Sequence, residues 1–149
     1  MNRQKILFRD LGKMEYRAAW EYQENLLQEN VRRKTAFRNW EFVQRTNHTE
    51  HNLQPDELST RHYLLFVEHP PVYTMGKSGN LNHVLLGEKE MEERGIQFFK
   101  TNRGGDITFH GEQQIVGYPI LDLEKFYTDI GKYLRNLEEV IIQSLADYG

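Results

Sequence analysis

Apolar and polar residues follow two different periods in the first third of the chain. Ile6, Leu7 and Phe8 form a short apolar run before Asp10-Leu11-Gly12, which predicts a strand followed by a turn. From Glu15 onward the apolar side chains recur at helical spacing, which predicts an amphipathic helix. We expect this helix to pack its apolar stripe into the core, through Tyr16, Ala19, Trp20, Leu26, Leu27 and Val31.

Two polar segments follow this stripe. Arg32-Arg33-Lys34 is a run of three basic residues, which is more typical of a solvated helix face than of a nucleic-acid contact. Residues 39–60 are polar and show no period, so we expect a long surface loop or insertion there.

The middle of the chain changes to short apolar runs. Residues 62–67 are continuously apolar and rich in β-formers, which predicts a central strand buried on both faces. Pro70 and Pro71 end it, because proline donates no hydrogen bond to a neighbouring strand. The following segments predict a strand, a glycine-rich loop, a short charged helix closed by Gly95 and another strand, at residues 72–75, 76–80, 88–94 and 96–99.

The last third predicts two strands and a long helix. Residues 106–109 and 114–118 suggest strands paired around a turn at 110–112, with 119–121 extending the second strand. Asp122 is a candidate N-cap for the helix, and Gly149 stands where a glycine would end it. One apolar face runs along this helix, through Phe126, Ile130, Tyr133, Leu134, Leu137, Val140, Ile141, Leu145 and Tyr148.

Strands interleaved with helices predict a layered α/β or α+β fold, with a mixed sheet and packed helices in one domain spanning residues 1–149. The length of 149 residues suits one domain. The net charge of -3 argues against a general nucleic-acid binder. The longest apolar run, residues 63–67, is far too short to span a membrane, and no apolar leader follows Met1, so we expect a cytoplasmic protein.

Several familiar kinds of catalytic site fit the sequence poorly. The chain has no cysteine, which excludes a thiolate metal site and a cysteine nucleophile within it. His48 and His51 lie three residues apart, but in a polar segment without fixed geometry, and no HExxH motif is present, so we expect no metal. Gly76-Lys77-Ser78 has Pro71 where a phosphate-binding loop needs glycine. No serine lies in a nucleophile elbow.

The most informative segment contains Arg103, Gly104, Gly105, Asp106, Ile107, Thr108, Phe109 and His110. Adjacent glycines let a ligand approach the main chain. Arg103 supplies a planar cation, Asp106 a carboxylate and His110 a group that exchanges protons near neutral pH. A tight turn held by an Arg103–Asp106 ion pair would explain the same residues without a ligand. Composition alone leaves both readings open.

Three ordered motifs resemble the octanoyltransferases, also called lipoyl(octanoyl) transferases or lipoate-protein ligase B. The first is Asp10-Leu11-Gly12 followed by Tyr16, Ala18, Ala19, Trp20 and Gln23. The second is Glu68-His69-Pro70-Pro71-Val72-Tyr73-Thr74-Met75-Gly76-Lys77-Ser78. The third is the Arg103–His110 segment, which continues through Gly111 and then from Gln114 to Leu123.

The resemblance implies a domain like the catalytic domain of biotin and lipoate ligases. Such enzymes move an octanoyl group from octanoyl-acyl carrier protein to a lysine of a lipoyl domain, as in 2-oxoacid dehydrogenases and the glycine cleavage protein. They need no cofactor and no ATP, because the thioester already carries the activated acyl group. Residues 103–110 would line the acyl-substrate site. Nothing in the resemblance implies nucleic acid, a membrane or a metal.

The sequence departs from the family pattern at two places. Glu112-Gln113-Gln114 stands where the family usually has Pro-Gly-Gln, which changes the turn after His110-Gly111. The family also uses a cysteine that becomes acylated and a lysine that stabilises its thiolate, both beyond the matching motifs. Neither Lys125 nor Lys132 can be assigned that activating role. We therefore expect no catalytic residue in this chain, a domain whose C-terminal part is missing, and no activity from the chain alone.

Three alternatives to an active octanoyltransferase remain open. The chain is also consistent with a non-catalytic module that binds an acyl group or a carrier protein, or with a truncated inactive protein. An ATP-dependent lipoate or biotin ligase shares the fold but matches the motifs less well.

Overall fold

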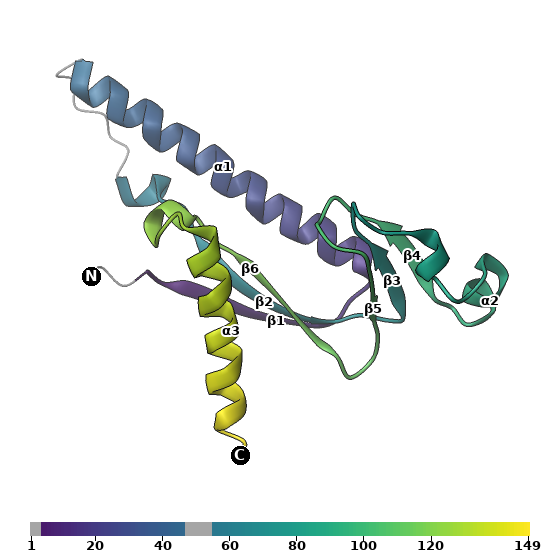
Figure 1. The fold of residues 1–149 in the computed structure, drawn as a ribbon. Coiled ribbons are helices and arrows are strands. Elements are labelled where there is room, and N and C mark those ends of the chain that lie inside the picture. The colour runs from purple at the N-terminus through teal and green to yellow at the C-terminus, as the bar shows by residue number, and fades with distance from the viewer. Residues whose placement is uncertain (1–3, 47–54) are drawn as a thin grey trace.

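The computed structural model describes residues 4–46 and 55–149, which build two three-stranded mixed sheets (Figure 1). In the first sheet a central strand pairs in parallel with one neighbour and antiparallel with the other, in the order β1 (Ile6–Lys13), β2 (His62–Glu68) and β6 (Ile115–Ile120). The second sheet repeats this scheme, in the order β4 (Gln97–Lys100), β3 (Val72–Met75) and β5 (Ile107–His110). The predicted mixed α+β fold is confirmed.

Within residues 4–46 and 55–149, three α-helices accompany the sheets: α1 (Tyr16–Thr46), α2 (Glu88–Glu93) and α3 (Ile130–Ala146). Single 3₁₀ turns lie at η1 (Pro55–Leu58), η2 (Leu81–His83) and η3 (Leu123–Lys125). Helix α1 runs diagonally along the first sheet, whereas α3 projects away from the rest of the molecule (Figure 1). The predicted short helix closed by Gly95 is confirmed as α2, and Gly95 has the expected positive φ of 65°.

The core lies between α1 and the first sheet. Leu26 of α1 packs against Tyr63 and Leu65 of β2, which are 2% and 0% exposed. The predicted core stripe therefore holds at Leu26 and at the buried Ala19, whereas Leu27 and Val31 are about half exposed. Side chains alternate across a strand, so the other face of β2 points away from α1. Its residues Leu64 and Phe66 are only partly covered, so β2 is central as predicted but fully buried on one face only.

The predicted pairing of residues 106–109 with 114–118 is wrong. Both strands exist, but β5 pairs with β3 and β6 pairs with β2. The Pro70-Pro71 corner places β2 and β3 in different sheets, and each takes one of the two later strands as its antiparallel neighbour. The intervening turn carries the chain from one sheet to the other, with Gln113 at a φ of 65°.

The prediction of a loop over residues 39–60 is also wrong in part. Residues 39–46 continue α1, and residues 55–58 form η1. The rings of Phe37 and Trp40 lie 5.8 Å apart within α1, and Arg38 forms an ion pair with Glu124 of η3. One local ring contact and one tertiary ion pair therefore support a helical end whose polar sequence suggested a loop. Residues 47–54 lie outside the described residues.

The terminal helix starts later than predicted. Asp122 caps η3, accepting a hydrogen bond from the backbone N–H of Glu124. The N-cap of α3 is Asp129, whose side chain accepts from the backbone N–H of Lys132 at 2.9 Å. Asp122 and Asp129 carry the same capping signal, and the sequence does not show which of them begins the long helix.

Candidate functional site

The segment singled out in the sequence is clasped to the loop after β3. The backbone N–H groups of Gly76, Lys77 and Ser78 donate to the carbonyls of Asp106, Arg103 and Gly105, over 2.8, 2.9 and 3.2 Å. These residues come from two sequence motifs nearly thirty residues apart. The structure therefore joins them into one rigid pair of loops at the end of the second sheet.

Glycine is required at the point of closest approach. A Cβ atom at Gly76 would lie 2.3 Å from the carbonyl oxygen of Gly105 and 2.7 Å from that of Gly104. Gly105 itself has a φ of 84°, a left-handed conformation that disfavours side chains. Gly104 has neither constraint, since a Cβ there would meet nothing within 4 Å. The space above Gly104 is consistent with close approach of a ligand to the main chain.

Arg103 holds this pair of loops against the second sheet. Its Nη2 donates to the carbonyl oxygen and hydroxyl of Thr74, at 2.8 and 3.1 Å, and to the hydroxyl of Thr108 at 3.0 Å. The contact with Asp106 is to the backbone carbonyl, at 3.2 Å. The sequence also allowed a tight turn held by an Arg103–Asp106 ion pair in place of a ligand site. That ion pair does not form.

The Asp106 carboxylate faces the other way, toward η2. It accepts the backbone N–H of Asn80 at 3.1 Å and pairs with Nδ1 of His83. The Asn80 N–H, followed by His83, lowers the pKa of Asp106, so this exposed carboxylate stays ionised well below neutral pH.

The strand β5 presents a polar face and an apolar face, as its alternating sequence predicts. Thr108 meets Arg103, and the ring of His110 lies 6.0 Å from that of His69. On the opposite face, Phe109 lies 5.1 Å from Tyr73. The predicted residues 103–110 are thus brought together around one end of the second sheet, with Thr108 and His110 turned toward the first.

His69 lies between the two sheets and is fully buried. Its Nδ1 is 2.8 Å from the carbonyl oxygen of Met14, which can only accept, so Nδ1 carries the proton. Its Nε2 then accepts the hydroxyl of Tyr118, also at 2.8 Å. Burial lowers the pKa of His69 and raises that of Tyr118 to about 12, so both groups are neutral at pH 7.

Aromatic rings complete this junction. The ring of Tyr16, at the start of α1, lies 5.4 Å from His69 and 5.1 Å from Phe99. Burial raises the pKa of Tyr16, and the nearby charge of Arg103 opposes that shift. Tyr16, His69 and Phe99 therefore form an aromatic junction where α1 and both sheets meet, with Arg103 of the clasped loops nearby. We call this junction the apolar corner.

Sequence reasoning did not identify His69, Tyr118 and Tyr16 as site residues, although each lies in a quoted motif. The missing information was the crossing of the chain between the sheets at residues 68–72 and 110–115. Those crossings bring the end of β2, the end of β5 and the middle of β6 together. In the part of the chain that the structure describes, no three His, Asp or Glu side chains are placed to hold a metal ion.

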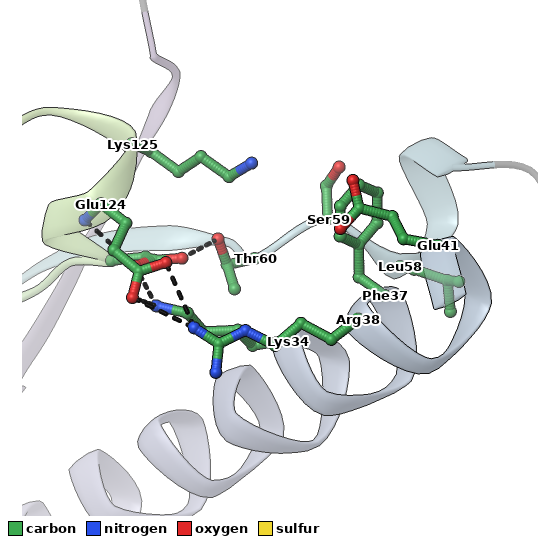
Figure 2. A pocket seen from close by; sticks show the side chains of 10 residues that line it. Lys34, Phe37, Arg38, Glu41, Leu58, Ser59, Thr60, Glu124 and Lys125 are labelled. Carbon is green, nitrogen blue, oxygen red and sulfur yellow. Dashed lines mark hydrogen bonds and ion pairs between the residues drawn. The ribbon is translucent and has the colours of Figure 1, made fainter. Parts of the chain in front are cut away.

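A hollow of about 230 Å³ lies away from this junction, at the opposite end of β2 between α1 and η3 (Figure 2). Lys34 reaches the carboxylates of Asp122 and Glu124, at 2.8 and 2.9 Å, and the Thr60 hydroxyl donates to Asp122 at 3.0 Å. Burial alone would raise the pKa of Asp122, but these two partners outweigh it and lower the pKa. Because the charges satisfy one another, we interpret this cluster as a latch that fixes η3 to α1. It also shows that Lys34 is not simply a solvated residue.

Comparison with known proteins identifies a family for this chain. The model of the lipoyl protein ligase A/B catalytic domain matches residues 15–149. An octanoyltransferase of Flavobacterium johnsoniae is 54% identical over 145 residues, covering 97% of this chain and 56% of that protein. One of Christiangramia forsetii is 48% identical over 149 residues, covering 100% of this chain and 57% of that protein. The chain therefore spans a little over half the length of these relatives.

The described helices were also compared with the length and hydropathy that a bilayer requires. None of them is both long and apolar enough to cross a membrane.

Proposed function

Because the chain belongs to the lipoyl protein ligase A/B catalytic domain family, we propose that it contributes the acyl-binding site of an octanoyltransferase. The donor would be octanoyl-acyl carrier protein. The acceptor would be a lysine of a lipoyl domain, such as those of 2-oxoacid dehydrogenases and the glycine cleavage protein, in the cytoplasm. The observation that carries this proposal is the clasp between residues 76–78 and 103–106 beside the apolar corner of Tyr16 and Phe99.

The proposed binding energy comes mainly from the acyl chain. Burying an alkyl chain gains about 0.8 kcal/mol per CH₂, so six methylenes and a methyl would supply about 6 kcal/mol. The apolar corner would receive the chain. The open main chain at Gly104 and the guanidinium of Arg103 would lie near the polar thioester end. His69 and Tyr118 would hold the corner in shape, because their polar atoms already satisfy each other.

The proposed reaction proceeds in two steps that balance without ATP. A cysteine thiolate attacks the thioester carbonyl, so a new thioester forms and the carrier leaves as a thiolate, which takes up a proton from water. The acceptor lysine amine then attacks the new thioester, forming an amide and releasing the cysteine, while the amine loses a proton. The chain contains no cysteine, so the nucleophile and its activating lysine would come from the polypeptide that matches the rest of the relatives. We expect the 149-residue chain alone to give no turnover.

The lack of cysteine also favours a second candidate function. The chain would then bind an octanoyl group or its carrier protein without transferring it. The same site residues would serve either function, because both require the acyl chain to be held.

Mass spectrometry of a lipoyl domain incubated with octanoyl-acyl carrier protein tests the proposal. We expect no octanoyl-lysine with the chain alone, and octanoyl-lysine when the unmatched segment of an octanoyltransferase relative is fused after Gly149. Activity of the fusion should fall strongly in Arg103→Met. Transfer by the chain alone would contradict the cysteine route. Carrier binding by a fusion that gives no transfer would favour the binding module.

A further inference from the structure

Three basic side chains gather at the edge of the second sheet where β3 and β4 end. The two strands run parallel, so their carboxyl ends meet at this edge, with Lys77 two residues after β3 and Lys100 the last residue of β4. The start of α1 lies beside the same sheet (Figure 1), and the guanidinium of Arg17 lies 5.2 Å from the ring of Phe99. We call Arg17, Lys77 and Lys100 the basic rim.

The charge of the basic rim is not neutralised within the described residues. All three side chains belong to exposed residues, and no carboxylate in residues 4–46 and 55–149 forms an ion pair with them. The carboxylate of the clasped loops, Asp106, is already paired with His83. Arg103 adds a positive charge behind the rim, because in the described structure its guanidinium donates only to carbonyl and hydroxyl oxygens. The whole chain carries a net charge of -3, so this edge is a local exception.

The basic rim lies next to the proposed acyl site. The backbone N–H of Lys77 donates to the carbonyl of Arg103 within the clasp, over 2.9 Å. Arg17 packs on Phe99, which is one of the rings of the apolar corner. An acyl thioester bound between the corner and the clasp would therefore leave its carrier group beside the rim. The exposed rim side chains can reach that group, whereas Arg103 is held in place by its hydrogen bonds.

The positive charge of the rim distinguishes between the two macromolecules of the proposed reaction. The acceptor presents a lysine, which is cationic near neutral pH and is repelled by a basic surface. The donor presents its acyl group on a phosphopantetheine arm, whose phosphodiester is anionic. Acidic side chains around the base of this arm would add further charges that complement the rim. Such complementarity orients the partner and speeds encounter, and salt weakens it.

Resting on the proposed function, we propose that the basic rim docks an acidic face of the acyl carrier protein while the octanoyl chain enters the apolar corner. The rim reads the protein part of the carrier, beyond the phosphate of its arm. Arg17 contacts the carrier from α1, and Lys77 and Lys100 contact it from the second sheet. The carrier thereby spans the two elements that enclose the corner.

Calorimetric binding of three octanoyl thioesters to the full 149-residue chain tests the basic rim. Octanoyl-pantetheine is uncharged, octanoyl-phosphopantetheine adds the phosphate, and octanoyl-acyl carrier protein adds the protein surface. We expect the triple variant Arg17→Gln, Lys77→Gln and Lys100→Gln to bind the carrier at least about tenfold more weakly in about 0.1 M salt. In about 1 M salt the difference from the original chain should shrink below about threefold, because the charges are screened.

A matched triple variant removes the same number of charges elsewhere. Lys5→Gln, Arg45→Gln and Lys89→Gln lie at exposed positions away from the rim, and together they should change carrier binding by less than about twofold. Equal weakening in the two triple variants would overturn the proposal, because net charge alone would then explain the effect. A rim variant that weakens octanoyl-phosphopantetheine as much as the carrier would also overturn it, since the phosphate alone would then be read. So would a rim variant that weakens binding of a lipoyl domain and spares the carrier.

The uncharged thioester separates the failure of this proposal from the failure of the proposed function. An original chain that does not bind octanoyl-pantetheine would contradict the proposed acyl site. If octanoyl-pantetheine binds and the carrier gains no salt-dependent affinity over it, the docking surface alone is overturned. Salt-dependent binding of the carrier without its octanoyl group, lost in the rim variant, would support the docking surface on its own.

Discussion

Replacing Gly76 by alanine should open the clasp on which the candidate site depends. The new Cβ would lie 2.3 Å from a backbone oxygen, whereas ordinary contact begins at 3.4 Å, so one loop must move by about 1 Å. Such a shift breaks or weakens the three hydrogen bonds from Gly76, Lys77 and Ser78. At about 0.5–1.5 kcal/mol for each bond, the expected loss of unfolding free energy is about 1.5–4.5 kcal/mol.

The neighbouring glycines supply matched controls for this substitution. Gly105→Ala places a side chain at a φ of 84°, which costs about 1–2 kcal/mol. Gly104→Ala meets nothing within 4 Å, and its stability should stay within about 0.5 kcal/mol of the original chain. If the space at Gly104 also receives the ligand, Gly104→Ala should keep this stability. The same substitution in the fusion with the unmatched segment of a relative should then abolish octanoyl transfer.

Urea unfolding followed by fluorescence of Trp20 and Trp40 measures these differences. The reasoning predicts the order Gly76→Ala, Gly105→Ala, Gly104→Ala from most to least destabilised. A Gly76→Ala variant as stable as the original, or a Gly104→Ala variant equally damaged, would refute it.

Three further predictions concern the groups that fix the fold around the site. His69→Phe removes the hydrogen bonds to Met14 and Tyr118 and should lower the free energy of unfolding in urea by about 2–4 kcal/mol. The control His83→Phe, at an exposed position, should lower it by less than about 0.5 kcal/mol. Equal losses in the two variants would contradict the role assigned to His69. Burial lowers the pKa of His69 below 6.5, so as the pH falls the unfolded chain protonates His69 before the folded chain does. The free energy of unfolding should therefore fall as the pH drops below about 6.5 and level off below the pKa of His69 in the folded chain. The same dependence of stability on pH in His69→Phe would contradict this. Asp122→Asn should lower the free energy of unfolding by about 1–2 kcal/mol, and with it the melting temperature, because the Asp122 carboxylate is nearly buried. Glu124→Gln, at an exposed position, should change the melting temperature little. The reverse order of the two variants would contradict the latch.

Elements defined by local sequence were predictable. The apolar run at residues 62–67 and the proline corner after it give β2 and β3 at their observed places. The alternation along residues 107–110 gives the polar and apolar faces of β5. Local period and proline chemistry are sufficient for these features, because neither depends on a distant partner.

Features set by distant partners were not predictable. Strand β5 lies close to β6 in sequence, but the free edge of β3 was its better partner. Residues 39–46 are polar, yet they continue α1, whose preceding turn is tied to η3 by the ion pair of Arg38 with Glu124. The role of His69 required knowing that Met14, just after β1, and Tyr118, in the middle of β6, both meet it. The residue types gave the candidate chemistry, and only the crossing between sheets gave its arrangement.

A nuclear magnetic resonance titration with an octanoyl thioester of pantetheine tests most directly whether residues 103–110 form the acyl site. The 17.8 kDa chain is small enough for amide spectra, and binding requires no cysteine. The account predicts that shifts concentrate at residues 76–78 and 103–110 and around His69, and that Arg103→Met reduces them. Shifts confined to the hollow around Lys34 and Asp122, or the same shifts with hydrophilic acetyl-pantetheine, would contradict it.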